Sequence, residues 1–268
     1  MGFDLSGLLG GLLDITVPQL IMVVVGLILM GLGIFKDYEP TLLIPIGFGC
    51  ILGNLPVAVN MVGENGLFGV LYKAGISNEL FPLLIFLGVG AMLDLRPLLS
   101  QPIMFIMGAF AHLGIFATLI VALLLGFNLA ESTAIGMIGA IDGPTVIYVN
   151  GKLGDLFVTP GLAAAIAVTA YSYMSLVPII QPPLMRLFTT KKERGIRMEY
   201  TPRPVSRATV IIFPILITII AAIFLPEAAP LIATLMLGNL LKESDVVPGL
   251  VETSKNAITN TATIFLGI

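Results

Sequence analysis

The sequence predicts an all-α membrane protein: a polytopic helical bundle with broken or re-entrant helices and a two-fold internal, inverted repeat whose second copy is incomplete. Three observations predict this fold class. Hydrophobic residues make up 57% of the chain and charged residues 11%, whereas soluble domains have about 45–50% and 25%. Apolar runs long enough to cross a bilayer alternate with shorter runs that Gly and Pro interrupt. Short motifs also recur in the same order in the two halves of the chain.

Four runs predict membrane-spanning helices. A helix needs about 20 apolar residues to cross the roughly 30 Å of hydrocarbon in a bilayer. Three runs meet this length outright, and a fourth does so despite its polar centre, TAYSY. They are residues 17–35, 102–127, 208–225 and 158–180.

Four further apolar runs are short or interrupted by Gly and Pro: residues 40–59, 80–93, 131–149 and 229–241. Backbone that is not helical cannot face lipid, because its N–H and C=O groups would have no hydrogen-bond partner there. We therefore expect these segments to pack against protein or to line a hydrated cavity.

A series of four features occurs twice along the chain. A long span, the acidic turn KDYEP, GNLP at 53–56 and IFLGVG at 85–90 are matched by a span at 208–225, PEAAP, GNLL at 238–241 and IFLGI at 264–268. The series predicts a first membrane repeat over residues 1–185, with a broken helix at 139–148, and the start of a second over 208–268. The first copy continues for many residues beyond its IFLG motif, so we expect the chain to be truncated at its C-terminus.

The segment between the repeats is basic. Residues 186–207 hold seven of the 13 Lys and Arg residues, and the apolar flanks are almost uncharged. Positively charged loops stay on the cytoplasmic side of a membrane, so we expect a cytoplasmic loop in a multi-pass protein of the cell (inner) membrane. Such a loop needs no nucleic-acid partner to explain it. Cys50 is the single cysteine, so no internal disulfide is available.

The stretch GAIDGPTVIY places Asp142 inside an apolar run. Counting from Glu131, a helix would bring Asp142 about halfway through the hydrocarbon, where a carboxylate costs about 2.5–3.5 kcal/mol on insertion scales. Gly143 and Pro144 directly after it should unwind the helix and expose main-chain carbonyls. With the carboxylate and the Thr145 hydroxyl, these oxygens suit a hard cation such as Na⁺. The alternative is that Asp142 caps a helix, or bonds a neighbouring one, at an ordinary Pro kink.

Other polar residues leave alternatives open. Tyr171, Ser172 and Tyr173 are consecutive, and neighbours on a helix point about 100° apart, so they cannot all face one site. One tyrosine could face the cavity and bind a cation or donate a proton, or it could form an interhelical hydrogen bond. His112 could relay protons, or it could be a packed, neutral imidazole bonded to a backbone carbonyl.

Some polar residues can be explained by a structural role without a functional one. Asp94 and Arg96 follow an apolar run and fit the membrane interface. Asn54 and Asn239 occupy matching places in the repeat and are expected to cap or hydrogen-bond short helices. The glycines of GVGAM follow no strand and are expected to serve helix packing. The sequence has no Cys/His metal spacing, GxSxG motif or phosphate-binding loop, which argues against common soluble-enzyme classes.

Three segments carry a family resemblance: IGAIDGPTVIYVNGKL, AIAVTAYSYMSLVPIIQPPLMRLFTTKKERGIRM and ITNTATIFLGI. They resemble the beta subunit of the sodium-pumping biotin-dependent decarboxylases, the family that includes the oxaloacetate, methylmalonyl-CoA and glutaconyl-CoA decarboxylase beta subunits. The resemblance implies an enzyme subunit that removes CO₂ from carboxybiotin, consumes a proton and couples this step to outward Na⁺ transport.

The resemblance also implies residues and partners. It assigns Na⁺ handling and catalysis to the aspartate of DGPT and the second tyrosine of YSY, which are Asp142 and Tyr173; with Thr145 they form the expected Na⁺ site. The expected partners are a carboxyltransferase (alpha) subunit, small membrane-anchor (gamma/delta) subunits and a biotin carrier domain, in an oligomer within the lipid bilayer. The chain departs from the family's usual Gly-Gly-Ala at residues 139–141, and the family's later helices are absent.

Two other functions fit the same features. A sodium-coupled secondary transporter of a small anion would also use broken helices and a carboxylate near the bilayer midplane, without catalysis. A membrane scaffold without activity would show no sodium dependence. Biotin in the purified complex would distinguish the decarboxylase from both.

Overall fold

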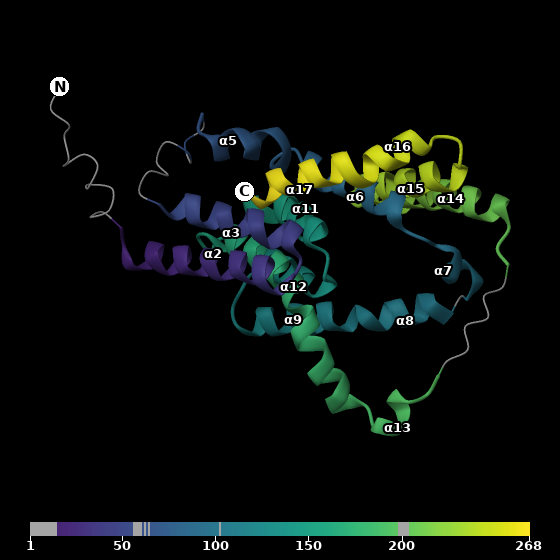
Figure 1. The fold of residues 1–268 in the computed structure, drawn as a ribbon, viewed down its shortest axis with the longest axis horizontal. Coiled ribbons are helices and arrows are strands. Elements are labelled where there is room, and N and C mark those ends of the chain that lie inside the picture. The colour runs from purple at the N-terminus through teal and green to yellow at the C-terminus, as the bar shows by residue number, and fades with distance from the viewer. Residues whose placement is uncertain (1–14, 56–60, 62, 64, 102, 198–203) are drawn as a thin grey trace. The chain divides into compact units, whose positions relative to one another are not determined.

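The computed structural model describes residues 15–55, 61, 63, 65–101, 103–197 and 204–268, except for the side chain of Ser175 (Figure 1). Every regular element in these residues is a helix, which confirms the all-α prediction. The chain divides into two compact units, one of Met1–Phe81 with Thr263–Ile268 and the other of Pro82–Ala262.

The first unit is built on a hairpin of α2 (Val17–Lys36) and α3 (Pro40–Asn54), which lie side by side in Figure 1. Helix α2 ends where Asp37 adopts a left-handed conformation and donates its N–H to the carbonyl of Leu32. Pro40 then begins α3 at a position that needs no N–H donor. The helices α5 (Leu67–Leu71) and η2 (Tyr72–Ile76), the latter a π-helix, complete the described part of the unit's N-terminal segment.

The remaining elements follow in chain order. They are α6 (Leu80–Met92), α7 (Arg96–Ser100), α8 (Ile103–Ala111), α9 (Leu113–Leu124), α10 (Leu129–Met137), η3 (Ile138–Ala140), α11 (Gly143–Leu153), η4 (Gly154–Leu156), α12 (Leu162–Phe188), α13 (Lys191–Arg194), α14 (Arg207–Phe224), α15 (Ala229–Ser244), α16 (Pro248–Thr253), η5 (Ser254–Ile258) and α17 (Thr259–Gly267). Helices α14 and α15 form a second hairpin.

In the part of the chain that the structure describes, three helical segments are long and apolar enough to cross a membrane: Val17–Lys36, Ile103–Leu124 and Arg207–Phe224. Two bent helix pairs, Leu67–Ile76 with Leu80–Met92 and Leu162–Met174 with Leu176–Phe188, also qualify if each pair is counted as one span. The three single segments confirm three of the predicted spans, although Pro102, the first residue of one prediction, lies outside the described residues. Most of their large apolar side chains are exposed. Exposed apolar surface of this extent fits helices that face lipid.

The fourth predicted span was wrong in its bounds. Helix α12 begins at Leu162 and continues to Phe188, and it bends by 63° between Leu162–Met174 and Leu176–Phe188. Pro178 explains the bend, because it has no N–H for the carbonyl of Met174 and its ring collides with that carbonyl. Pro182 and Pro183 also lie inside this helix.

Of the four apolar runs expected to be broken, three form continuous helices and one is broken. Residues 80–93 give α6 and residues 229–241 give α15, which extends to Ser244. Residues 40–59 give α3, and the end of that prediction, from Pro56, lies outside the described residues. Residues 131–149 give α10, η3 and α11, so this run is broken as predicted.

The order of elements recurs along the chain. The hairpin of α2 and α3 is followed by a short α-helix, the π-helix η2 and α6; the hairpin of α14 and α15 is followed by a short α-helix, the π-helix η5 and α17. This order agrees with an internal repeat. The repeat itself, its boundaries and the cytoplasmic position of residues 186–207 stay predictions, and residues 198–203 of that loop lie outside the described residues.

Within the second unit, α6 and α15 cross with their backbones almost in contact. A Cβ atom added to Gly238 would lie 2.0 Å from the carbonyl oxygen of Leu87, and one added to Gly90 would lie 1.9 Å from that of Leu235. The packing role expected for the GVGAM glycines is therefore confirmed at Gly90. Asn239, which is buried, donates its Nδ2–H to the carbonyl of Leu93 at 3.0 Å. This bond satisfies a carbonyl at the end of α6, which is the structural role expected of Asn239.

We expect Gly238→Leu to prevent this crossing and to lower the unfolding midpoint of the detergent-solubilised protein. Overpacking costs about 1–3 kcal/mol when side chains can move, and here the obstacle is backbone. Gly114→Leu is the matched control, because it lies inside α9 with no atom within 4 Å of an added Cβ. Equal unfolding midpoints for the two variants would contradict the close crossing.

Candidate functional site at the broken helix

The helix that begins at Leu129 breaks before Asp142. Helix α10 tightens into the 3₁₀ turn η3, Ile141 adopts a left-handed conformation (φ 57°, ψ 39°), and Asp142 is extended. A β-branched residue in the left-handed region costs about 1–3 kcal/mol, so the surrounding structure must hold it there. The helical backbone is interrupted at Ile141 and Asp142, within residues 139–148, where the sequence predicts a broken helix. Pro144 lies in the first turn of α11, where its missing N–H is not needed.

Asp142 occupies the N-cap position of α11. One carboxylate oxygen accepts a hydrogen bond from the Thr145 hydroxyl, one turn along the helix. Within the described residues, the Asp142 side chain has no hydrogen bond to a neighbouring helix. The two residues therefore bring a carboxylate and a hydroxyl together at the break, which is an oxygen donor set.

Gly143 lets the start of α11 lie directly on α12. A Cβ atom on Gly143 would lie 2.5 Å from Cε1 of Tyr171, and the Gly143 N–H donates to the sulfur of Met174 at 3.1 Å. Tyr171 and Met174 are three residues apart and so share one face of α12. Tyr171 is 4% exposed, so its side chain is buried next to the start of α11. Tyr171 is thus the tyrosine that the structure places at the break.

Tyr173 lies elsewhere on α12. It is two residues beyond Tyr171, about 200° around the helix, and it is half-buried without a described contact to Asp142. Ser172 donates its hydroxyl to the carbonyl of Val168 at 2.7 Å, so its hydrogen bond stays within its own helix. The sequence left open which tyrosine faces Asp142. In the structure, the contact between the Tyr171 ring and Gly143 distinguishes Tyr171 from Tyr173.

A buried glutamate anchors α10, the first half of the broken element. Glu131 is 1% exposed, and its carboxylate accepts hydrogen bonds from the backbone N–H groups of Asn128 at 3.0 Å, Val158 at 3.0 Å and Thr159 at 2.7 Å. The Asn128 side chain accepts in return from the Glu131 N–H at 2.9 Å. Sequence reasoning missed this role, although an Asn followed three residues later by Glu before an apolar run is a capping-box signal.

The second half of the element is tied down as well. Asn150 donates its side-chain N–H to the carbonyl of Ala163 at 2.7 Å, and the Tyr148 hydroxyl donates to the carbonyl of Glu227 at 2.8 Å. A small apolar core joins α10, α11 and α12, and it consists of Ala134, Val146, Ile166 and Ala170. These contacts hold both sides of the break, so Asp142 lies between two anchored helices.

His112 separates α8 from α9. One ring nitrogen, Nδ1, lies 2.7 Å from the carbonyl oxygen of Gly108, as expected for an imidazole bonded to the backbone. The side chain is exposed rather than packed, so that part of the expectation was wrong. Among the described residues, no group of three or more His, Cys, Asp or Glu side chains could hold a metal ion.

Comparison with known protein families identifies the family of the chain. Residues 18–268 match the family model described as the Na⁺-transporting oxaloacetate decarboxylase beta subunit. The chain belongs to this family. The match includes the broken helix with Asp142 and the helix with Tyr171 and Tyr173, and it agrees with the resemblance seen in the sequence.

Curated relatives of the family cover 96% of the chain. It is 52% identical to the methylmalonyl-CoA decarboxylase subunit beta of Veillonella parvula and 47% identical to the glutaconyl-CoA decarboxylase subunit beta of Acidaminococcus fermentans, each over 256 residues. It is 40% identical to the oxaloacetate decarboxylase beta chain of Klebsiella pneumoniae over 318 aligned residues. The chain spans 66% of the length of the first two relatives and 72% of the third.

Proposed function

We propose that the chain acts as the membrane subunit of a sodium-translocating decarboxylase: it decarboxylates carboxybiotin presented by a partner subunit and couples this step to outward Na⁺ transport. Family membership favours this function over a secondary transporter. The observation that carries the proposal is the paired carboxylate and hydroxyl of Asp142 and Thr145 at a helix break, next to a buried tyrosine.

Sodium would enter as the transported substrate. Asp142 supplies the negative charge, and Thr145 can offer an oxygen lone pair to the ion while its O–H still donates to the carboxylate oxygen. Moving one positive charge against 100 mV costs about 2.3 kcal/mol. Decarboxylation must therefore proceed only when Na⁺ occupies this site. Otherwise the free energy of decarboxylation would be lost without Na⁺ transport.

In carboxybiotin, a carboxylate carbon is bonded to a ring nitrogen. When this C–N bond breaks, CO₂ leaves and the electron pair of the bond stays on the nitrogen. The apolar walls of α10, α11 and α12 exclude water from the carboxylate, whose charge disperses as the bond breaks. A tyrosine hydroxyl donates the proton that the nitrogen takes up. The resemblance implicates Tyr173 in Na⁺ handling and catalysis, so Tyr173 either completes the Na⁺ site or delivers this proton. The contact with Gly143 adds Tyr171 as the tyrosine nearer to the break.

The proposed function also implies a cellular location and partner subunits for the chain. It places the chain in the cell membrane, in an oligomeric complex with a carboxyltransferase (alpha) subunit, gamma/delta anchor subunits and a biotin carrier domain. The basic loop of residues 186–207 lies on the cytoplasmic side, where a soluble biotin domain could reach the membrane subunit. Which acyl substrate feeds the complex depends on the partner that carries the carboxyltransferase.

Purification of the tagged chain from its host membranes tests the proposal. We expect a biotin-carrying polypeptide to co-elute with the chain, as shown by an avidin blot, and the eluate to decarboxylate its substrate only when Na⁺ is present. A chain that binds Na⁺ and transports a small anion without any biotin in the preparation would support the secondary transporter instead.

The two tyrosines give a separate prediction. We expect Tyr171→Phe to change the Na⁺ concentration for half-maximal decarboxylation, because its side chain is buried against Gly143, the residue that follows Asp142. We expect Tyr173→Phe to lower the turnover at saturating Na⁺ if it delivers the proton. Steady-state assays of both variants across Na⁺ concentration separate these effects, and equal responses of the two variants would contradict the assignment.

A further inference from the structure

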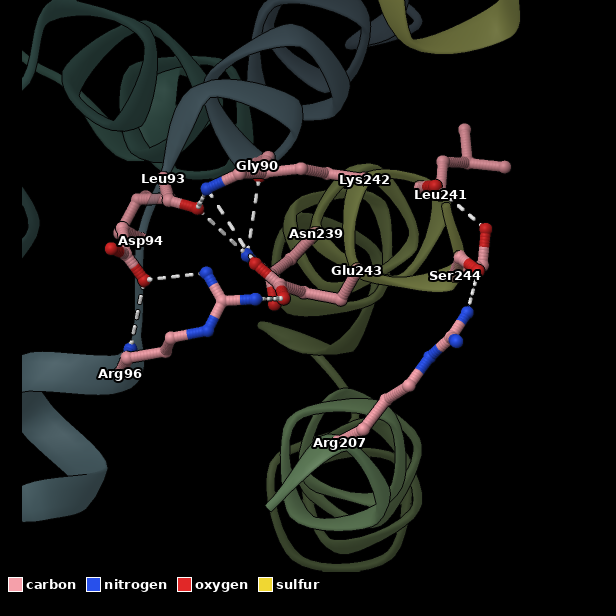
Figure 2. Close-up of polar contacts among 10 residues, drawn as sticks. All are labelled: Gly90, Leu93, Asp94, Arg96, Arg207, Asn239, Leu241, Lys242, Glu243 and Ser244. Atoms are coloured by element: carbon pink, nitrogen blue, oxygen red, sulfur yellow. Dashed lines mark hydrogen bonds and ion pairs between the residues drawn. The ribbon is translucent and has the colours of Figure 1, made fainter. Parts of the chain in front are cut away.

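A second polar site lies where the start of α7, the start of α14 and the end of α15 come together (Figure 2). A cavity of about 430 Å³ is lined by three cations, two carboxylates and two valines: Arg96, Arg207, Lys242, Glu243, Asp245, Val205 and Val210. This volume is within the range of small-molecule pockets. None of these residues belongs to the proposed Na⁺ site.

Glu243 organises two of the cations. Its side chain is 3% exposed, and its carboxylate lies 2.5 Å from a guanidinium nitrogen of Arg96 and 3.5 Å from Nζ of Lys242. Lys242 also donates to the carbonyl of Leu93 at 2.7 Å, as Figure 2 shows. Arg96 and Lys242 are therefore held in place before any ligand arrives, which lowers the entropy cost of binding.

Arg207 supplies the charge that this cluster does not neutralise. Its described contact is with the neutral carbonyl oxygen of Ser244, at 2.9 Å. Arg96 and Lys242 already lie beside Glu243, and Arg96 also pairs with Asp94 at 3.6 Å. A phosphodiester carries one negative charge and would pair with Arg207.

The position of the cavity indicates where the anion comes from. Arg207 is the first residue of α14, which is long and apolar enough to cross a membrane. Farther along α14, exposed Ile212, Ile215 and Ile219 form apolar surface of the kind that lipid chains cover. Basic pockets at the ends of membrane helices bind lipid headgroups. A headgroup phosphate at Arg207 would leave its acyl chains beside α14.

We propose that Arg96, Arg207 and Lys242 form a binding site for the phosphodiester of a membrane phospholipid, at the membrane surface from which α14 starts. The site does not depend on the proposed decarboxylase function. Its role would be to fix the ends of α7, α14 and α15 to one lipid headgroup.

Titration of the detergent-solubilised chain with phosphatidylglycerol, followed by native mass spectrometry, tests the site. Arg207→Gln should weaken binding of the first lipid by about fivefold to tenfold, since one charge-assisted contact is lost. Lys191→Gln, an equal charge change in the exposed helix α13, should leave it unchanged. A second titration with inorganic phosphate identifies the source: binding of phosphate that depends on Arg207, without lipid binding, assigns the same site to a free anion.

Two outcomes would overturn the proposal: equal weakening in Arg207→Gln and Lys191→Gln, which indicates unspecific attraction, or no binding of either probe to the wild-type chain. Unfolding midpoints measured without lipid control for folding. A variant Arg207→Lys keeps the charge but loses the planar donor group, and it should restore most of the lipid binding if charge dominates.

Discussion

Replacing Asp142 by Asn is expected to abolish sodium-dependent decarboxylation in the complex that carries the chain. Asn has nearly the same shape as Asp and can still accept the hydrogen bond from Thr145, so the helix break should persist. The substitution removes the single negative charge of the proposed Na⁺ site. Losing a hydrogen bond to a charged group costs about 1.5–3 kcal/mol, so we expect a loss of activity of about 10-fold to 150-fold or more.

Assays of purified complex at several Na⁺ concentrations measure this effect. Asp155→Asn is the matched control, because Asp155 is exposed in η4 and should tolerate the same change. Thr145→Val should give a smaller loss, since it removes only a neutral ligand. Wild-type turnover in Asp142→Asn, with an unchanged response to Na⁺, would reject Asp142 as an ion ligand.

Gly143→Ala should have the second large effect. The added methyl group would lie 2.5 Å from the ring of Tyr171, which is 4% exposed and packed on all sides. Overpacking of this kind costs about 1–3 kcal/mol and forces neighbouring backbone to shift. Because Gly143 follows Asp142 directly, the shift moves the carboxylate, and we expect activity to fall together with the unfolding midpoint.

Two further variants make this prediction specific. Gly154→Ala has no atom within 4 Å of the added Cβ and should be close to neutral. Tyr171→Ala removes the ring, so Gly143→Ala should cost much less stability in that background than in the wild type. Additive stability losses in the double variant would show that the two residues do not collide.

The sequence predicts the helices of this protein better than the contacts between them. Length and hydropathy decide a membrane span locally, so the spans near Val17, Ile103 and Arg207 were confirmed. The Gly–Pro pair after Asp142 is also a local signal, and the break was confirmed there. The predicted bounds of the fourth span, residues 158–180, were wrong, because α12 covers Leu162–Phe188 and continues through Pro182 and Pro183.

Contacts between distant residues could not be predicted. Arg96 meets Glu243 across 147 residues of sequence, and Gly143 meets Tyr171 across α11 and α12. Both depend on how helices pack, which no short motif encodes. The left-handed Ile141 is likewise unexpected, because a β-branched residue disfavours that conformation and only the surrounding fold imposes it.

The central claim is that Na⁺ binds at the Asp142 carboxylate. Carbodiimides that dissolve in lipid modify carboxyl groups within membranes, and peptide mass spectrometry reports the extent of modification at Asp142 in the solubilised chain. We predict that Na⁺ slows this modification in a saturable way while the same concentration of K⁺ does not. Modification of Asp142 at the same rate with and without Na⁺ would contradict the account.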